Sequence, residues 1–283
     1  MMKIIESPRE GMQGFPRIIP LMEKVRYIQH LFRVGFDTIE IGSVVSPKVI
    51  PQMADSLEIL KKLDLSHTST NRMCLAVNVR GAEILAMKDT LTHISYPFSF
   101  SPTFLKLNVN STVEQSFDVT ETLIDLCLKS RKQPVIYISM AFGNPYGDPW
   151  SMGLLAEWVG KLYHAGARII AFSNVSVEID AALITQVYST LIPMFPDVEF
   201  GLHLHTTNVG WYDKVNAAYL SGCRRFDGVI NGWGGCPMAG KEMLGNLKTE
   251  NLITFAEEKK RLGNIDQTAF AEVCKMAEEV FEE

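Results

Sequence analysis

Two histidines, His203 and His205, are separated by a single residue in the segment GLHLHTTN. If this segment is a β-strand, residues i and i+2 point to the same side, so both imidazoles face one way. Imidazoles suit divalent Zn, Mn, Fe or Co, and added oxygen ligands shift the preference toward Mg or Mn. The spacing alone leaves two interpretations open, a divalent metal site or an ordinary hydrogen-bonded pair.

Charged residues also interrupt two apolar segments near the amino terminus. Arg9 and Glu10 follow the first apolar run, in ESPREGMQG, and they form either a surface ion pair or part of a site. Glu40 lies within TIEIG, where strand alternation places it opposite Ile39 and Ile41. A carboxylate in an apolar strand needs a partner, so Glu40 is either a structural group paired with an arginine or part of a site.

A glycine-rich segment, NGWGGCPMAGKEMLGN, contains Cys236 and closes at Asn246. A thiol with a tuned pKa on a mobile glycine-rich loop can act as a general acid or base. A free cysteine can equally be a small, inert, buried apolar group. The surrounding glycines favour the mobile loop.

Short β-branched segments alternate with helical segments along the chain. Parallel strands joined by crossover helices give this alternation, and eight repeats in about 250 residues favour a closed barrel. The sequence therefore predicts a single α/β domain over residues 1–283, a (β/α)8 TIM barrel with an extra carboxyl-terminal helix at 266–283. We expect strands at 3–6, 37–42, 72–78, 92–98, 134–142, 168–173, 198–205 and 224–230, and helices at 21–35, 112–131, 152–166 and 212–222.

The barrel prediction explains where the polar residues fall. Catalytic residues of TIM barrels come from the carboxyl-terminal ends of the strands and the loops that follow them. The polar and charged residues singled out above, together with Ser173 and Asn174 after the sixth predicted strand, all fall there. We therefore expect them to meet at one mouth of the barrel.

Composition excludes some classes of partner. The net charge is −5 and there is no basic run, which argues against nucleic acid as a main partner. No apolar segment approaches the roughly 18 residues of a membrane span, so we expect no membrane association. The five cysteines are odd in number and lack C-x-x-C spacing, which predicts a reduced, cytoplasmic protein.

Five segments resemble, in chain order, the motifs of one enzyme family. SPREGMQ, IEIGSVVSPKVIPQMAD, SMAFGNPYGD, GLHLHTTN and GWGGCPMAG are similar to motifs of the 3-hydroxy-3-methylglutaryl-CoA lyases, which belong to the metal-dependent TIM-barrel lyases and synthases (DRE-TIM metallolyases). The resemblance runs from about residue 3 to residue 255. It implies retro-Claisen cleavage of a 3-hydroxyacyl-CoA, by default hydroxymethylglutaryl-CoA to acetyl-CoA and acetoacetate. It also implies a divalent metal, most simply Mg or Mn with Zn or Co as alternatives, and a homodimer.

The resemblance also implies a role for each matching residue. Arg9 would polarise the thioester carbonyl and stabilise the enolate, Cys236 would transfer a proton, and Glu40 would orient the site. The substrate pocket would include Gln13, Ser173 and Asn174. The metal would be held by Glu10, His203, His205 and Asn246.

Four positions depart from the family pattern. Glu10 stands where the lyases usually have Asp, which moves the carboxylate outward by about one bond, roughly 1.5 Å. Ser173 and Thr206 each replace an expected carboxylate, and Val135 replaces an expected arginine. These changes favour the same chemistry on an altered substrate. A same-fold aldolase or acyltransferase acting on a different 2-keto or hydroxy acid, and a non-catalytic barrel with a vestigial metal site, remain alternatives.

Overall fold

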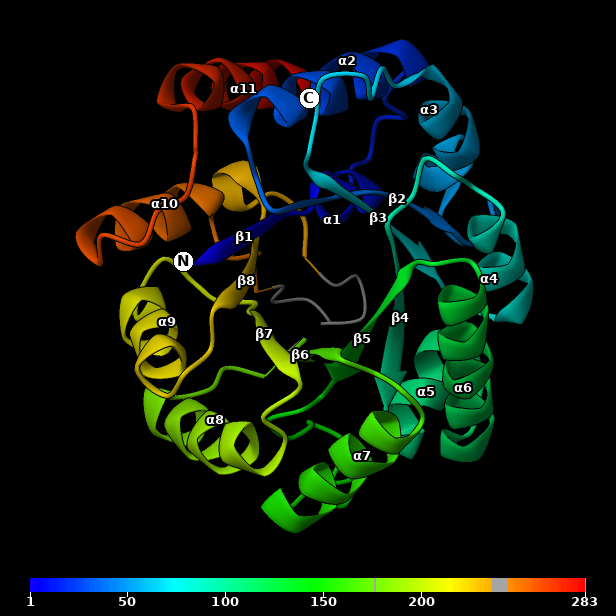
Figure 1. The fold of residues 1–283 in the computed structure, drawn as a ribbon, viewed down its shortest axis with the longest axis vertical. Coiled ribbons are helices and arrows are strands. Elements are labelled where there is room, and N and C mark those ends of the chain that lie inside the picture. Colours follow the sequence, from blue (N-terminus) through cyan, green and yellow to red (C-terminus); the bar gives the residue numbers. More distant parts are fainter. Residues whose placement is uncertain (176, 236–243, 283) are drawn as a thin grey trace.

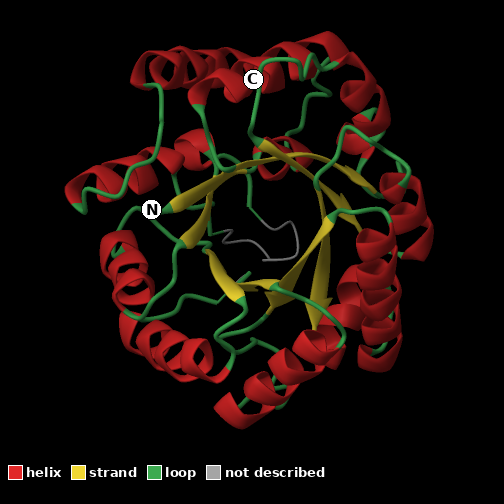
Figure 2. Ribbon diagram, viewed as in Figure 1, coloured by secondary structure: helices red, strands yellow, loops and turns green. Residues whose placement is uncertain are grey.

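Parallel strands form a closed barrel at the centre of the molecule, in the order β1 to β8. The structure is a computed structural model that describes residues 1–175, 177–235 and 244–282. Figure 2 shows this ring of strands surrounded by helices. Each strand pairs with the next along the chain, and β1 closes the barrel against β8. The strands are β1 (Lys3–Glu6), β2 (Thr38–Val44), β3 (Asn71–Ala76), β4 (His93–Ser99), β5 (Gln133–Ser139), β6 (Ile169–Ser173), β7 (Glu199–His203) and β8 (Arg225–Gly228).

Helices cover the outside of the barrel (Figure 1). Side-chain caps begin several of them, including the capping box of Thr112 and Gln115 at α6, which satisfies backbone donors at the helix start. The helices are α1 (Pro8–Gln13), α2 (Leu21–Val34), α3 (Ser56–Lys62), α4 (Val79–Ala86), α5 (Pro102–Val109), α6 (Val113–Lys129), α7 (Met152–His164), α8 (Ala181–Met194), α9 (Trp211–Leu220), α10 (Thr249–Glu258) and α11 (Gln267–Val280), with 3-10 turns η1 (Pro51–Met53) and η2 (Ile230–Gly232).

The predicted barrel is confirmed, with shifts at the element ends. β5 stops at Ser139 rather than at residue 142, and β7 stops at His203, so His205 lies just beyond its strand. The loop expected after β1 is the short helix α1, which has Pro8 in its first turn. Proline is pre-organised for that position, so the sequence contained a helix-start signal that the strand-and-loop interpretation passed over.

Two apolar layers hold the barrel together. The larger layer lies between the strands and the surrounding helices. A smaller cluster fills the barrel interior and includes Ile5, Met73, Val135, Tyr137 and Ala171. Side chains therefore pack the interior below the mouth, as in TIM barrels generally, and Val135 contributes to that packing where an arginine was expected.

The predicted carboxyl-terminal helix is α11, which lies beside α2 in Figure 1. Phe281, directly after α11, makes edge-on ring contacts with Tyr27 of α2 and with Phe15. The same ring stacks on Trp233 at a centroid distance of 5.6 Å. The end of the chain thus packs against the segment that leads from β8 into the glycine-rich loop. Within the described ranges, no helix has the length and apolarity needed to cross a membrane.

Candidate active site

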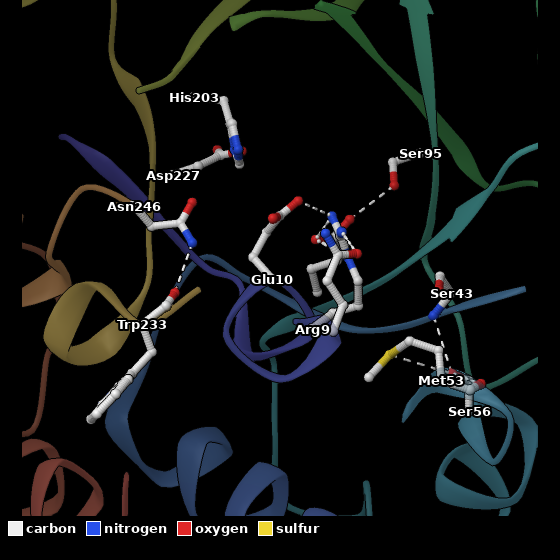
Figure 3. Close-up of polar contacts among 12 residues, drawn as sticks. Arg9, Glu10, Ser43, Met53, Ser56, Ser95, His203, Asp227, Trp233 and Asn246 are labelled. Atoms are coloured by element: carbon white, nitrogen blue, oxygen red, sulfur yellow. Dashed lines mark hydrogen bonds and ion pairs between the residues drawn. The ribbon is translucent and has the colours of Figure 1, made fainter. Parts of the chain in front are cut away.

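Arg9 lies at the centre of a buried polar cluster at the carboxyl-terminal mouth of the barrel (Figure 3). Its Nε and Nη2 both donate to Oε2 of Glu40, at 3.0 and 2.6 Å. Nη1 donates to Oε1 of Gln13 at 2.9 Å. Nη2 also lies 2.7 Å from Oε1 of Glu10. The Arg9–Glu10 pair is therefore a buried part of the site, and the surface-pair interpretation is wrong.

Glu40 supports the guanidinium from inside β2. Its second oxygen, Oε1, accepts a hydrogen bond from Ser95 of β4 at 3.2 Å. The pairing of β2 with β3 shifts register between Glu40 and Gly42, an irregularity that re-aims side chains near active sites in many sheets. The structure thus confirms that Glu40 pairs with an arginine, and that arginine is Arg9.

The two carboxylates beside Arg9 have opposite pKa shifts. Burial raises the pKa of Glu40, and the guanidinium of Arg9 only partly offsets this. Burial also acts to raise the pKa of Glu10, but Arg9, and then His203 and His205, bring it below its ordinary value. Glu10 is therefore an anion at neutral pH, facing a guanidinium on one side and the two histidines on the other.

The histidines lie together as predicted, with ring centroids 5.0 Å apart. Nδ1 of His203 hydrogen-bonds Oδ2 of Asp227 in β8 at 3.0 Å. Burial lowers the pKa of His203, but that bond and the charge of Asp227 raise it above its ordinary value. Burial, and next to it His203, lowers the pKa of His205 to about 3. His205 is consequently neutral, and its buried Nδ1 has no hydrogen-bond partner among the described groups.

Asn246 returns to this mouth from the far end of the glycine-rich loop. It forms an isolated antiparallel bridge with His205, and its Nδ2 donates to the carbonyl of Trp233 at 2.8 Å. Figure 3 shows Asn246 on one side of Glu10 and Arg9 on the other. Cys236, the expected proton donor or acceptor, lies outside the described residues.

The predicted substrate residues Gln13, Ser173 and Asn174 lie near the mouth, but the side chain of Asn174 is already hydrogen-bonded to the backbone of His205. Oδ1 of Asn174 accepts a hydrogen bond from the backbone nitrogen of His205 at 2.8 Å, and Nδ2 donates to the His205 carbonyl at 2.8 Å. Ser173 is buried at the end of β6, where its Oγ accepts from the Val175 nitrogen at 3.3 Å. Gln13 is half-buried against Arg9.

Sequence reasoning missed two residues of this site. Asp227 is buried within β8 and holds His203, and Tyr137 of β5 packs its ring edge-on to His203 at 5.5 Å. The only sequence signal for Asp227 was a single acidic residue in the apolar part of RRFDGVI. Thr206, where a carboxylate was expected, accepts from Nζ of Lys214 at 3.1 Å.

The donor set suits a hard or borderline divalent cation. Glu10 is anionic, His205 is neutral with an unpartnered buried nitrogen, and the Asp227 bond fixes one nitrogen of His203 and leaves the other. This combination of a carboxylate and two oriented imidazoles matches known metal chemistry. Within the described ranges, however, no three His, Cys, Asp or Glu side chains already have metal-site spacing, and Oε1 of Glu10 is paired with Arg9 instead.

Comparisons with known proteins identify the family of the chain. The family model described as HMGL-like matches residues 2–277. The mitochondrial hydroxymethylglutaryl-CoA lyase of Rattus norvegicus is 31% identical over 252 residues, covering 89% of this chain and 77% of the relative. The (R)-citramalyl-CoA lyase of Chloroflexus aurantiacus is 31% identical over 266 residues, covering 87% and 80%.

Solved structures give the same result. An HMG-CoA lyase from Acinetobacter baumannii, in complex with coenzyme A and 3-methylmalate, superposes with a TM-score of 0.90 at 26% identity. The match covers 99% of this chain and 91% of that one. The closed barrel described above is therefore shared with that lyase along nearly the whole chain.

Proposed function

The chain belongs to the HMGL-like family, and from that premise we propose that it is a lyase that splits a 3-hydroxyacyl-CoA into acetyl-CoA and a keto acid by retro-Claisen chemistry. The supporting observation is the buried guanidinium of Arg9, held beside Glu10, His203 and His205 at the mouth of the barrel. Hydroxymethylglutaryl-CoA is the first candidate substrate, because most of the relatives named above are lyases of that thioester.

Arg9 is the residue suited to the charge that develops during cleavage. Breaking the carbon–carbon bond leaves negative charge on the acetyl-CoA enolate, and a fixed donor in a water-poor site stabilises such charge. Glu40 and Gln13 hold three of the guanidinium nitrogens in place. The guanidinium is therefore oriented before the substrate binds, and it needs little rearrangement in the transition state.

Glu10, His203, His205 and Asn246 are the residues that would hold a divalent metal. When bound, such a metal supplies Lewis-acid chemistry that lowers the pKa of a substrate hydroxyl. Asp227 orients His203, and Asn174 fixes the backbone of His205. These contacts keep both imidazoles aimed at the same space. The remaining requirement, an acid for the enolate carbon, falls to Cys236 by resemblance alone.

A second candidate substrate is (R)-citramalyl-CoA. One observation supports it, a 31% identity with a lyase named for that thioester, which equals the identity with the rat hydroxymethylglutaryl-CoA lyase. Charges that the resemblance predicts are also missing: Ser173 and Thr206 replace carboxylates, and Val135, in the packed interior below the mouth, replaces an arginine. Both thioesters release acetyl-CoA, so the proposed chemistry is the same and only the acyl chain differs.

The test is acetyl-CoA release from each thioester by purified protein, measured by mass spectrometry with Mg²⁺ or Mn²⁺ and again with EDTA. We expect metal-dependent release from at least one of them, and the ratio of kcat/KM values identifies the better substrate. Absence of release from both thioesters, with protein that binds the metal, would overturn the proposal. It would favour the same-fold aldolase or acyltransferase on another acid, or the non-catalytic barrel. The homodimer, also implied by resemblance, is tested by light scattering.

A further inference from the structure

The aromatic ring of Phe281 lies between two segments that lead to the mouth of the barrel. Phe281 directly follows α11 and is 2% exposed. Its ring meets those of Phe15 and Tyr27 edge-on, at centroid distances of 5.5 and 6.2 Å. It stacks on the ring of Trp233 at 5.6 Å, with 20° between the ring planes. Aromatic pairs in these arrangements attract one another beyond the effect of burial, so the Phe281 ring is held from three sides.

The first of the two segments is α1, the helix that contains Arg9 and Glu10. A Cβ at Gly11 would lie 3.2 Å from Cζ of Phe281 and 3.2 Å from Cγ1 of Val229, which is tighter than ordinary van der Waals contact. The absence of a side chain at Gly11 therefore lets the Phe281 ring reach the backbone of α1. The ring packs directly on the helix that presents Glu10 to the site.

The second segment comprises residues 229–235, which follow β8. Trp233, in this segment, is 38% exposed and stacks on Phe281. The next residue, Gly234, has a φ of +77°, and a Cβ there would collide with the carbonyl oxygen of Glu10. Glycine is the residue that satisfies both the backbone angle and the space. The segment 229–235 therefore lies against the backbone of Glu10, with the Phe281 ring beside the contact.

The same segment holds Asn246 through its backbone. Nδ2 of Asn246 donates to the carbonyl oxygen of Trp233 at 2.8 Å. Figure 3 shows the Trp233 ring directed away from Glu10, while its carbonyl faces Asn246. A donating Nδ2 fixes the rotation of the amide group, and the amide oxygen is the atom that suits a hard cation. The placement of that oxygen thus depends on where the Trp233 backbone lies.

We propose that Phe281 is a positioning residue for the metal site. Its ring holds the segment 229–235 against α1 and, through the carbonyl of Trp233, fixes the amide of Asn246 on the same side of the mouth as Glu10. Phe281 touches neither metal nor substrate. The inference rests on the proposed use of Glu10 and Asn246 as metal ligands, two residues that lie far apart in the sequence and are brought together through this contact.

The test is Phe281→Leu, which keeps an apolar side chain and removes the ring. The first readout is hydrogen exchange of the Asn246 side-chain amide in metal-free protein, from ¹⁵N-asparagine NMR assigned with Asn246→Asp. The second is Mn²⁺ affinity by titration. Loss of a partner behind a metal ligand typically weakens metal binding 10- to 100-fold. We expect Phe281→Leu to exchange the Asn246 amide at least tenfold faster than wild type and to bind Mn²⁺ about tenfold more weakly.

Phe270→Leu is the matched control. Phe270 belongs to α11, is 8% exposed and meets Phe36 edge-on at a centroid distance of 6.3 Å. Its loss removes a similar aromatic contact of the same helix without touching α1 or the segment 229–235. Both leucine variants should unfold at lower urea concentration than wild type. Only Phe281→Leu should change the two site readouts, and Phe270→Leu should keep both within twofold of wild type.

Trp233→Leu removes the same stacked pair from its exposed side, and it serves as the test variant if Phe281→Leu does not fold. When both variants fold, the double variant should bind Mn²⁺ within about twofold of the weaker single variant, because residues that act through one contact are not additive. A folded Phe281→Leu or Trp233→Leu protein with both readouts within twofold of Phe270→Leu would overturn the inference, as would fully additive losses in the double variant. Wild-type protein that binds no Mn²⁺ would instead count against the proposed function, and the Asn246 amide would still decide the role of Phe281.

Discussion

Nε and Nη2 of Arg9 converge on one carboxylate oxygen, Oε2 of Glu40, at 3.0 and 2.6 Å. Both residues are buried, and Glu40 is in turn held by Ser95. The orientation of the guanidinium therefore depends on a residue that lies 31 positions further along the chain. This relationship gives the first prediction.

Glu40→Ala should reduce kcat by about 10²-fold, because Arg9 loses two of its anchoring bonds and no longer points in one direction. The size follows from the loss expected when one fixed transition-state donor is removed. Steady-state kinetics of acetyl-CoA release measure it, with Glu83→Ala on the exposed side of α4 as the control. A Glu40→Ala enzyme with wild-type kcat would show that Arg9 does not need this anchor.

Glu10 provides the second prediction, since it carries one methylene more than the aspartate expected there. Glu10→Gln removes the anion that faces His203 and His205, and it should weaken Mn²⁺ binding by tenfold or more. Glu10→Asp keeps the charge and should bind Mn²⁺ more tightly than Glu10→Gln. Isothermal titration calorimetry measures both. Equal affinities for the Gln and Asp variants would contradict a ligand role for this carboxylate.

Glu6 predicts a pH dependence of stability. It is buried at the end of β1 and accepts from the Ile230 nitrogen at 3.1 Å and from the Thr249 hydroxyl at 2.5 Å. Burial raises the pKa of Glu6 to about 8 from 4.5. The folded protein therefore keeps a proton that the unfolded chain releases near pH 4.5. The contribution of Glu6 to the free energy of unfolding is fully present below pH 4.5. It falls by about 1.4 kcal/mol per pH unit as the pH rises toward 8.

Urea unfolding of wild type and Glu6→Gln between pH 5 and pH 9 measures this effect. The variant stays neutral, so the wild type should lose stability relative to it as the pH rises. Glu58→Gln is the control, because Glu58 is an exposed carboxylate paired with Lys61. A wild-type-minus-Glu6→Gln difference that stays flat across this range would show that Glu6 is ionised in the folded protein.

Asn174→Ala tests the two hydrogen bonds that hold the backbone of His205. The substitution leaves the buried backbone nitrogen and carbonyl of His205 without their partner, which costs about 1–3 kcal/mol in the free energy of unfolding. Mn²⁺ affinity should fall with it, because His205 is no longer fixed. Chemical denaturation measures the loss, and Asn251→Ala on α10 is the comparison. Unchanged stability would mean that other contacts hold this backbone.

The alternation of strand and helix was readable from the sequence because parallel strands are apolar on both faces and the helices between them are amphipathic. The residues at which the strands end were harder to predict from the sequence. His205 lies beyond β7 because its backbone bonds with Asn174 and pairs with Asn246, contacts to distant segments. The i and i+2 argument still placed the two histidines together, and their ring centroids lie 5.0 Å apart.

The site was readable where residue types are unusual for their surroundings, as with Glu40 in TIEIG. The partner of each charged side chain could not be predicted, because it depends on which strands face one another across the barrel. Asp227 and Arg225 look like ordinary charges in RRFDGVI, and only the packing of Gly201 and Ala171 shows that Arg225 turns inward. Val135 stands where the resemblance predicts an arginine, and Arg225 brings a buried cation into the interior from another strand.

The central claim is that Arg9 stabilises the charge formed when a hydroxyacyl-CoA is cleaved. The most direct measurement is single-turnover formation of acetyl-CoA by wild type and by Arg9→Met, at saturating metal and with the better of the two thioesters. Arg17→Met, an exposed arginine near the same helix, is the matched control. We predict that Arg9→Met forms acetyl-CoA about 10³-fold more slowly than wild type and that Arg17→Met matches wild type. An Arg9→Met rate within tenfold of wild type would contradict the account.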